Sequence, residues 1–158
     1  SMQLLIALGA NIGSRAAALR AAIAALTAEV GLLVKCSAFY ETEPEGFQSS
    51  HAFLNAVAHF ETTHSAPRIL QITQAIERRM GRTTKSQDGI YHDRPIDIDI
   101  LALGDTICHT QDLTLPHPHI AERRFVLEPL TEILPTWRHP LTHATATEML
   151  KGYEQNTN

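Results

Sequence analysis

The sequence predicts an α+β domain in which two helices pack on one face of an antiparallel sheet. The main observation is that short apolar runs alternate with two stretches of helical periodicity in the order β-α-β-β-α-β. In addition, 44% of the 158 residues are hydrophobic, which is enough for an ordinary core in one domain. We therefore expect a single domain over residues 1–158, with Ser1 as a tag remnant and 153–158 as a polar tail.

The first half of the chain should form two strands and the first helix. An apolar run closes on a turn that contains glycine and asparagine, after which Ser14 is a suitable N-cap for a helix. Gly31 would end that helix, and a polar loop would follow the second strand. In order, we predict a strand over 3–8, a turn over 9–13, a helix over 14–28, a strand over 33–40 and a loop over 41–46.

The second half should complete the sheet with two more strands and the second helix. Residues 53–60 alternate between the two faces of a strand, and Ser65 followed by Pro67 marks a helix start. From there we predict a helix over 65–80, a polar loop over 82–95, an Asp-containing strand from 96, a loop over 115–125 and short helices over 128–134 and 146–151. This order, with a C-terminal extension, is the split-βαβ or ferredoxin-like signature.

Two aspartates in the run RPIDIDIL at 94–101 are the clearest chemical signal. Asp97 and Asp99 alternate with isoleucines, so in a strand the isoleucines would bury one face and both carboxylates would share the other. Like charges about 7 Å apart repel by roughly 2 kcal/mol at an effective dielectric constant near 20, and a cation would relieve this. Such carboxylates suit Mg²⁺ that also carries substrate phosphates. A strand with one solvated face gives the same alternation and binds nothing.

The loop before this strand has the composition of a phosphate-binding lid. Arg82, Lys85 and Arg94 supply positive charge beside the aromatic Tyr91, and the loop leads directly to Asp97. Arginine and lysine could contact the phosphate oxygens of a ligand whose Mg²⁺ sits on the carboxylates. An ordinary solvated loop would carry the same charges.

Polar residues of the second helix and a His-rich segment could complete such a site. Gln74 and Glu77 are three residues apart and therefore share a helix face, although surface polarity explains them equally well. The H-x-H spacing in LPHPH at 115–119 suggests zinc, but the prolines favour an extended segment and a third ligand at characteristic spacing does not follow. A phosphate contact from His117 and Arg123 fits better, with a solvated histidine as the alternative.

Composition narrows the range of partners. The net charge is −4, from 13 basic and 17 acidic residues without a long run of either sign, which disfavours a broad nucleic-acid footprint. Cys36 and Cys108 lack metal or redox spacing and suit a reducing compartment. The sequence contains neither an apolar run of about 20 residues nor a signal-peptide pattern, which predicts a cytoplasmic protein. P-loop and dinucleotide fingerprints are also missing.

Several motifs in order along the chain resemble the 6-hydroxymethyl-7,8-dihydropterin pyrophosphokinase family of folate biosynthesis. They are LGANIG, FYETEP, FLNA, QAIERRMGR, DRPIDIDIL and LPHPHIAERRFVLEPL, and they lie between residues 8 and 130. The resemblance implies a ferredoxin-like fold and a Mg²⁺-dependent transfer of pyrophosphate from ATP to the hydroxymethyl group of the pterin, with release of AMP. We expect a monomer that binds these two substrates and neither nucleic acid nor membrane.

The resemblance also assigns roles to single residues. Asp97 and Asp99 would hold two Mg²⁺ ions that bridge the triphosphate, and Asp97 could help to take the hydroxyl proton. Arg82 and Arg94 would act in catalysis by neutralising phosphate charge as the loop closes. The implied ATP contacts are Gln74, Glu77, Lys85, Tyr91, Ile100, Thr114, His117 and Arg123. The implied pterin contacts are the stacking rings of Phe53 and Phe125 and the edge-reading Thr42, Glu43, Glu45 and Asn55.

The chain departs from the family pattern mainly in the loop after the second helix. Thr84 stands where a second arginine is usual, Lys85 follows it, and Tyr91 stands near the position of a common tryptophan. Asp112 and Pro118 replace an arginine and a tyrosine that contact the nucleotide in some members. These departures concern ATP affinity and lid motion, whereas the reaction type depends on motifs that are present.

Two other functions stay open at this point. A ferredoxin-like regulatory or ligand-binding module would bind without turnover and would be insensitive to Asp99→Asn. A metal-dependent phosphodiesterase or nuclease is disfavoured by the lack of a basic surface. Formation of AMP that requires ATP, Mg²⁺ and the reduced pterin, and that is lost in Asp97→Asn, would separate the pyrophosphokinase from both.

Overall fold

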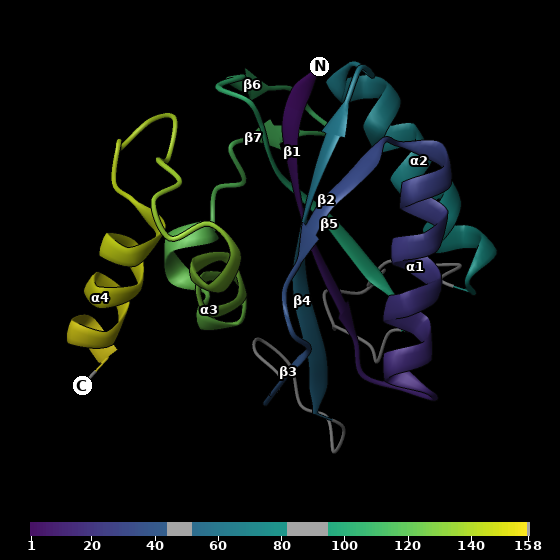
Figure 1. The fold of residues 1–158 in the computed structure, drawn as a ribbon, viewed down its shortest axis with the longest axis horizontal. Helices are drawn as coiled ribbons and strands as arrows, with labels where there is room; N and C mark the ends of the chain where they lie inside the picture. The colour runs from purple at the N-terminus through teal and green to yellow at the C-terminus, as the bar shows by residue number, and fades with distance from the viewer. Residues whose placement is uncertain (44–51, 82–94, 158) are drawn as a thin grey trace.

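The computed structural model describes residues 1–43, 52–81 and 95–157. Figure 1 shows a central sheet with helices on both of its faces. In chain order the elements are β1 (Met2–Ala10), α1 (Arg15–Glu29), β2 (Leu32–Cys36), β3 (Tyr40–Thr42), β4 (Phe53–Thr62), α2 (Ala66–Arg79), β5 (Asp97–Leu103), β6 (Cys108–His109), β7 (Thr114–Leu115), the 3₁₀ helix η1 (Ile120–Glu122), α3 (Arg124–Ile133) and α4 (Ala146–Thr157). The predicted order β-α-β-β-α-β is confirmed, with the second strand divided into β2 and β3.

The main sheet is antiparallel throughout. Within the described residues it has five strands in the order β2-β4-β1-β5, and β3 pairs with β4 as well. Each of these pairings is antiparallel, which confirms the α+β class. Because β1 lies between β4 and β5, the strand that carries Asp97 and Asp99 is at one edge of the sheet. The outer side of β5 is therefore available to other elements or to a ligand.

Helices α1 and α2 cover one face of the sheet, as predicted (Figure 1). They bury Leu19, Ala22 and Leu26 of α1 and Ile69, Ile72 and Ile76 of α2 against Leu4, Ile6 and Leu8 of β1. Each fully buried aliphatic side chain contributes about 1.5–3 kcal/mol. The start of α2 is fixed by Ser65, whose hydroxyl accepts a hydrogen bond from the Arg68 N–H. This packing holds the end of α2 beside β5.

Helix α3 covers part of the opposite face. There Leu5, Val57 and Leu101 from three adjacent strands meet Val126, Leu127 and Leu130 of α3. The predicted start of this helix at 128 is wrong, because α3 begins at Arg124 and contains Pro129 in its interior. An interior proline costs about 3 kcal/mol or more. Burial of the apolar stripe of α3 on the sheet offsets that cost, and sequence propensity alone does not reveal it.

The chain end is helical where a polar tail was expected. α4 continues to Thr157, so the predicted tail over 153–158 is wrong for its described residues. Met149 is 8% exposed and Tyr153, one turn later, packs against the same cluster as α3. Two apolar residues at i and i+4 are enough to dock an otherwise polar helix. None of the described helices has both the length and the apolar composition that a membrane crossing requires.

The predicted strand over 33–40 is interrupted because side chains take over some of the hydrogen bonds that main-chain groups make in a regular strand. The Ser37 N–H donates to the Val57 carbonyl at 3.0 Å, and the Ser37 hydroxyl accepts from the Val57 N–H at 3.0 Å. Next along the chain, the Ala38 N–H donates to both carboxylate oxygens of Glu132 on α3 at 3.1 Å. The Tyr40 hydroxyl donates to the same carboxylate at 2.6 Å. Glu132 thereby ties α3 to the gap between β2 and β3.

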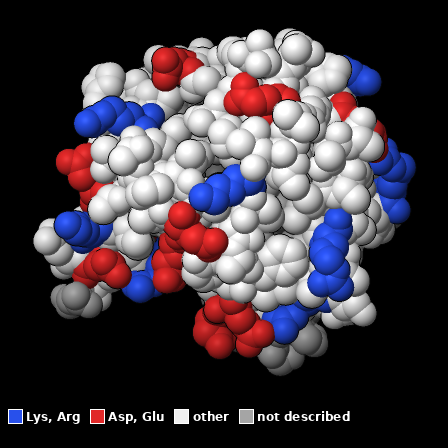
Figure 2. Space-filling view, viewed as in Figure 1, with Lys and Arg blue, Asp and Glu red and all other residues white. Residues whose placement is uncertain are grey.

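Charged side chains are interspersed on the face seen in Figure 2. Lys and Arg alternate with Asp and Glu over the described residues of this face, without one large area of a single sign. This face therefore does not offer the continuous positive area that long-range attraction of a polyanion requires.

Candidate active site

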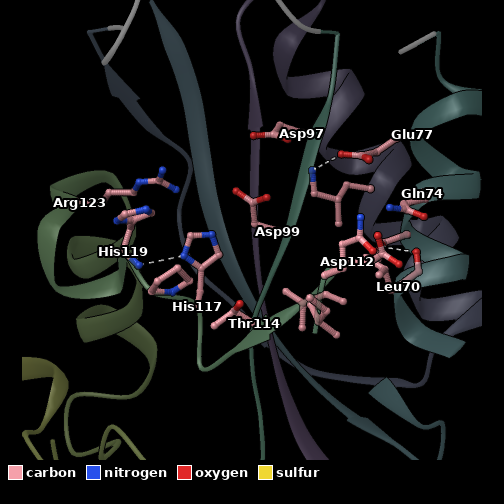
Figure 3. Close-up of a pocket in the computed structure, with 16 residues that line it drawn as sticks. Leu70, Gln74, Glu77, Asp97, Asp99, Asp112, Thr114, His117, His119 and Arg123 are labelled. Atoms are coloured by element: carbon pink, nitrogen blue, oxygen red, sulfur yellow. Dashed lines mark hydrogen bonds between the residues drawn. The ribbon is translucent and has the colours of Figure 1, made fainter. Parts of the chain in front are cut away.

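A cavity of about 530 Å³ opens along the outer edge of β5. Helix α2 and Asp112 of the β6–β7 turn lie on one side of it, and His117, His119 and Arg123 lie on the other (Figure 3). The polar lining consists of Thr73, Gln74, Glu77, Asp97, Asp99, Gln111, Asp112, Thr114, His117, His119 and Arg123. The apolar lining consists of Leu70, Ile98, Ile100, Leu113 and Pro118. This volume is in the range of pockets that take small-molecule ligands.

Asp97 and Asp99 occupy the middle of this cavity (Figure 3). Ile98 and Ile100 are 6% and 5% exposed and belong to the core under α1 and α2, so the predicted division of the strand into an apolar and a carboxylate face is confirmed. Asp99 pairs with Ala7 of β1, which packs on the α3 side of the sheet. Both carboxylates thus lie on the α3 side, beyond the end of the part that α3 covers.

Glu77 connects α2 with the aspartate strand. Its carboxylate Oε2 accepts a hydrogen bond from the Ile98 N–H at 2.8 Å, and the residue is only 8% exposed. Since Ile98 lies between the two aspartates, this bond fixes the strand at the point where both carboxylates emerge. Glu77 lines the cavity as expected, but its partner in the protein is a main-chain amide that sequence spacing did not predict.

His117 is held as a neutral donor on the opposite wall. The main-chain N–H of His117 donates to the Leu101 carbonyl at 2.8 Å, and the His117 ring Nδ1 accepts from the His119 main-chain N–H at 3.1 Å. Burial, with help from the nearby charges of Arg123 and His119, lowers the pKa of His117 to about 4, although Asp97 acts in the opposite direction. With Nδ1 accepting, the proton of the neutral ring lies on Nε2.

His119 has a different partner, which bears on the zinc alternative. Its Nδ1 lies 2.8 Å from Glu122 Oε2, and its ring meets that of His117 edge-on with centroids 5.8 Å apart. Across the described parts of the chain, no three His, Cys, Asp or Glu side chains form a group that could hold a metal ion. Within the described residues, the H-x-H segment is therefore not joined by a third protein ligand of the kind that zinc sites use.

Arg123 and Phe125 link the cavity to the neighbouring face of the sheet. The guanidinium carbon of Arg123 lies 5.6 Å from the centroid of the Phe125 ring, which is a cation–π contact. Arg123 lines the cavity, whereas Phe125 packs at the edge of the α3 cluster. Arg123 thus joins the cavity that contains the carboxylates to the aromatic ring of Phe125.

Three of the residues expected to bind a pterin, Thr42, Phe53 and Asn55, lie on the paired strands β3 and β4, whereas Phe125 is on α3. Asn55 is 5% exposed, and its amide Nδ2 donates to the Thr42 hydroxyl at 2.6 Å. Thr42 pairs with Phe53 across the two strands, and Glu43 is exposed directly after β3. The Arg15 guanidinium donates to the Ala52 carbonyl at 2.9 Å and to Glu41 at 2.8 Å, so it ties the ends of both strands to α1. This organising role of Arg15 was not predicted.

The structure brings together most of the described residues that the sequence singled out. The cavity contains Gln74, Glu77, Asp97, Asp99, Ile100, Thr114, His117 and Arg123. The predictions for Glu45, Arg82, Lys85, Tyr91 and Arg94 lie outside the described residues. Leu70 and Thr73 were missed, although with Gln74 and Glu77 they follow the i, i+3, i+4, i+7 spacing of one helix face, which could have identified them.

Taken together, paired carboxylates, a guanidinium and a neutral imidazole around one open cavity define an α+β domain of the class that handles phosphorylated ligands. Residues 5–135 match the family model described as 7,8-dihydro-6-hydroxymethylpterin-pyrophosphokinase (HPPK). The chain is 51% identical over 137 residues to 2-amino-4-hydroxy-6-hydroxymethyldihydropteridine pyrophosphokinase of Porphyromonas gingivalis, covering 85% of this chain and 92% of that protein. The chain belongs to the 7,8-dihydro-6-hydroxymethylpterin-pyrophosphokinase family.

Further relatives and solved structures agree with this membership. The protein of the same name from Bacillus subtilis is 41% identical over 129 residues, which cover 81% of this chain and 75% of that protein. The crystal structure of wild-type Plasmodium falciparum HPPK-DHPS matches 99% of this chain with a TM-score of 0.78 at 15% identity. A second solved HPPK-DHPS, in complex with substrates, gives a TM-score of 0.76 at 15% identity. This chain spans less than half of those two chains, 45% and 44%, and the likeness to them concerns the fold alone.

Proposed function

We propose that this chain transfers a pyrophosphoryl group from ATP to the hydroxymethyl group of 6-hydroxymethyl-7,8-dihydropterin in folate biosynthesis. The observation that carries this proposal is the cavity along β5, which is lined by Asp97, Asp99, His117 and Arg123. The chain that forms this cavity matches the family model over residues 5–135. In the reaction, the hydroxymethyl oxygen forms a bond to the β-phosphorus of ATP. The bond from that phosphorus to the oxygen of the α-phosphate breaks, AMP leaves, and the hydroxyl proton is released.

We propose Asp97 and Asp99 as the protein ligands of two Mg²⁺ ions. The fit rests on the donor set, because two carboxylates project from alternate positions of one strand into a cavity with room for further ligands. Mg²⁺ is usually bound through one or two carboxylates together with waters and substrate phosphates. When bound, it would neutralise charge on the phosphate oxygens and polarise the attacking hydroxyl. The chain's own contribution is a rigid strand, which Glu77 holds in place through Ile98.

The nucleotide is proposed to lie along the edge of β5 between α2 and η1. Gln74, Ile100 and Thr114 line this space together with the carboxylates. His117 and Arg123 lie on the side opposite Gln74 (Figure 3). Arg123 supplies a charged donor to phosphate, and His117 supplies a neutral N–H from Nε2. Catalytic roles for Arg82 and Arg94, and ATP contacts from Lys85 and Tyr91, stay predictions from the sequence.

The pterin is proposed to bind next to these groups, on the row of strands β3, β4 and β1. Asn55 offers its carboxamide to the polar edge of the ring, and Thr42 orients that carboxamide through the bond at 2.6 Å. Phe53 and Phe125 supply aromatic surface on which a flat heterocycle can stack. Main-chain contacts near Glu43 and Glu45 complete the predicted set.

Three further expectations, on fold classification, cellular location and oligomeric state, are proposed with this function. The strand order β2-β4-β1-β5 with two helices on one face supports a ferredoxin-like classification. The unpaired thiols of Cys36 and Cys108 support a cytoplasmic protein, since reducing conditions keep thiols free. A monomer that binds only its two substrates is the simplest arrangement, and light scattering across a range of protein concentrations tests it.

The test is AMP formation from ATP, Mg²⁺ and the reduced hydroxymethylpterin, followed by chromatography. We expect AMP only when all three are present, and none above background with Asp97→Asn. Asp105→Asn is the matched control, because Asp105 is exposed in the turn after the other end of β5. Ligand binding without AMP, with no effect of Asp99→Asn, would instead identify a binding module. Cleavage of nucleic acid or of phosphodiesters would identify the hydrolase alternative.

A further inference from the structure

We propose that Gly9 determines substrate specificity by forming a floor without a side chain between the pterin-reading amide and the metal-binding carboxylates. The inference rests on the proposed function. It assigns a role to a residue that does not line the nucleotide cavity. The sequence pattern had placed this residue in the predicted turn over 9–13.

The argument starts from strand register. Gly9 of β1 pairs with Asn55 of β4 on one side and with Asp97 of β5 on the other. Residues directly opposite each other in an antiparallel sheet point to the same face. Asn55, Gly9 and Asp97 therefore form one row across three strands, on the same face of the sheet as α3.

The spacing of this row matches the proposed ligand. In a central antiparallel strand a residue is hydrogen-bonded to one neighbour and non-bonded to the other, so the two Cα separations add up to about 10 Å. That length is comparable with the long dimension of a fused two-ring heterocycle with a one-carbon substituent. A pterin whose polar edge meets Asn55 can therefore bring its hydroxymethyl group to Asp97 only by crossing above Gly9.

Side-chain size on this face of β1 decreases toward the row. Leu5 is fully buried under α3, Ala7 packs at the margin of that cluster, and Gly9 follows. The φ angle of Gly9 is not in the left-handed region, so the backbone does not require glycine here. Glycine inside a strand is otherwise unfavourable and often marks a close approach of a ligand or of another chain segment.

A side chain at position 9 would collide with the pterin site. A Cβ added to Gly9 would lie 3.0 Å from Asn55 Oδ1 and 3.6 Å from Phe53 Cδ1. Asn55 cannot easily move away, because its Nδ2 is held by Thr42 at 2.6 Å. Gly9 is itself buried, and even a methyl group at this position would press on the reading amide. The nucleotide side should be unaffected, since it lies along the opposite edge of β5.

The experiment compares wild type with Gly9→Ala, using Gly152→Ala as the matched control. A Cβ at Gly152 meets nothing within 4 Å. We expect Gly9→Ala to weaken binding of 6-hydroxymethylpterin, measured by its fluorescence, by about tenfold or more. The affinity for MgATP, measured by calorimetry, should change less than about twofold. Gly152→Ala should leave both affinities unchanged. Folded Gly9→Ala with wild-type pterin affinity would overturn the inference.

A second measurement needs no variant and covers the case in which Gly9→Ala does not fold. In wild-type protein labelled at glycine, nuclear Overhauser effects should connect the Gly9 Hα protons with the bound pterin ring. Such effects from the pterin to Phe53 but not to Gly9 would contradict the proposed floor. A wild type that makes AMP while failing this test refutes the role of Gly9 alone. A wild type that neither binds pterin nor makes AMP refutes the proposed function and this inference together.

Discussion

Replacing His117 with asparagine tests whether the protein holds this histidine neutral at a structural cost. Asparagine is chosen because its Oδ1 can take the place of the ring Nδ1, which accepts the His119 N–H at 3.1 Å. In the folded protein the pKa of His117 is lowered to about 4 from its ordinary 6.5, with burial as the largest cause. An unfolded chain has no such burial and takes up the proton at its ordinary pKa.

The sign and size of the effect follow from proton linkage. Between about pH 6.5 and 4 the unfolded state binds the His117 proton and the folded state does not, so the free energy of unfolding falls as the pH falls. Above this range the contribution is constant. One pKa unit corresponds to about 1.4 kcal/mol, and the pKa falls from 6.5 to about 4, which gives at most about 3.5 kcal/mol over the whole range. Because His117 is only partly buried, solvent screening reduces the expected value to about 1–2 kcal/mol.

The assay is urea unfolding of wild type and His117→Asn at about pH 7.5 and about pH 4.5. We expect the wild type to lose about 1–2 kcal/mol more than the variant between the two pH values. His139, whose pKa burial lowers in the same direction, is present in both proteins and cancels in the comparison. Parallel pH profiles of the two proteins, or a His117 ring proton that titrates near 6.5 in the folded state by nuclear magnetic resonance, would refute the reasoning.

The remaining predictions concern close approach and buried hydrogen bonds. Gly31→Ala should destabilise the fold by about 2–3 kcal/mol in urea unfolding, because the new Cβ would lie 2.1 Å from a main-chain carbonyl oxygen of β4; an unchanged midpoint contradicts this. Glu77→Ala should leave the Ile98 N–H without this acceptor, lower the free energy of unfolding by about 1–3 kcal/mol and weaken MgATP binding in calorimetry. Glu77→Gln keeps an acceptor oxygen and should retain most of the stability and most of the affinity. Equal losses in the two variants would contradict the role of this hydrogen bond. Glu132→Gln should bring the pKa of Tyr40 down from about 12 toward its usual 10 in a spectrophotometric titration, because the charged hydrogen-bond acceptor is its largest cause; a pKa that stays near 12 would refute it.

Local patterns predicted the secondary structure wherever one period dominated. The alternation in β5 correctly placed Ile98 and Ile100 in the core and the aspartates on the other face. Serine at 65 correctly marked the start of α2. Both C-terminal helices were predicted, but their bounds were wrong where a tertiary partner overrode local preference: α3 begins earlier and contains Pro129, and α4, which docks through Met149, continues further. A weak apolar stripe becomes a helix only when a surface is present to receive it.

The sequence by itself determined the family, the order of strands and helices and the pair Asp97 and Asp99, because motifs and short periods are local properties of the chain. Only the tertiary structure decided which residues stand beside that pair. The alignment of Asn55 and Gly9 with Asp97, and the bond from Ile98 to Glu77, depend on strand register and on the docking of α2. Register is fixed by pairing between distant segments, and a one-residue slip would turn every side chain to the other face.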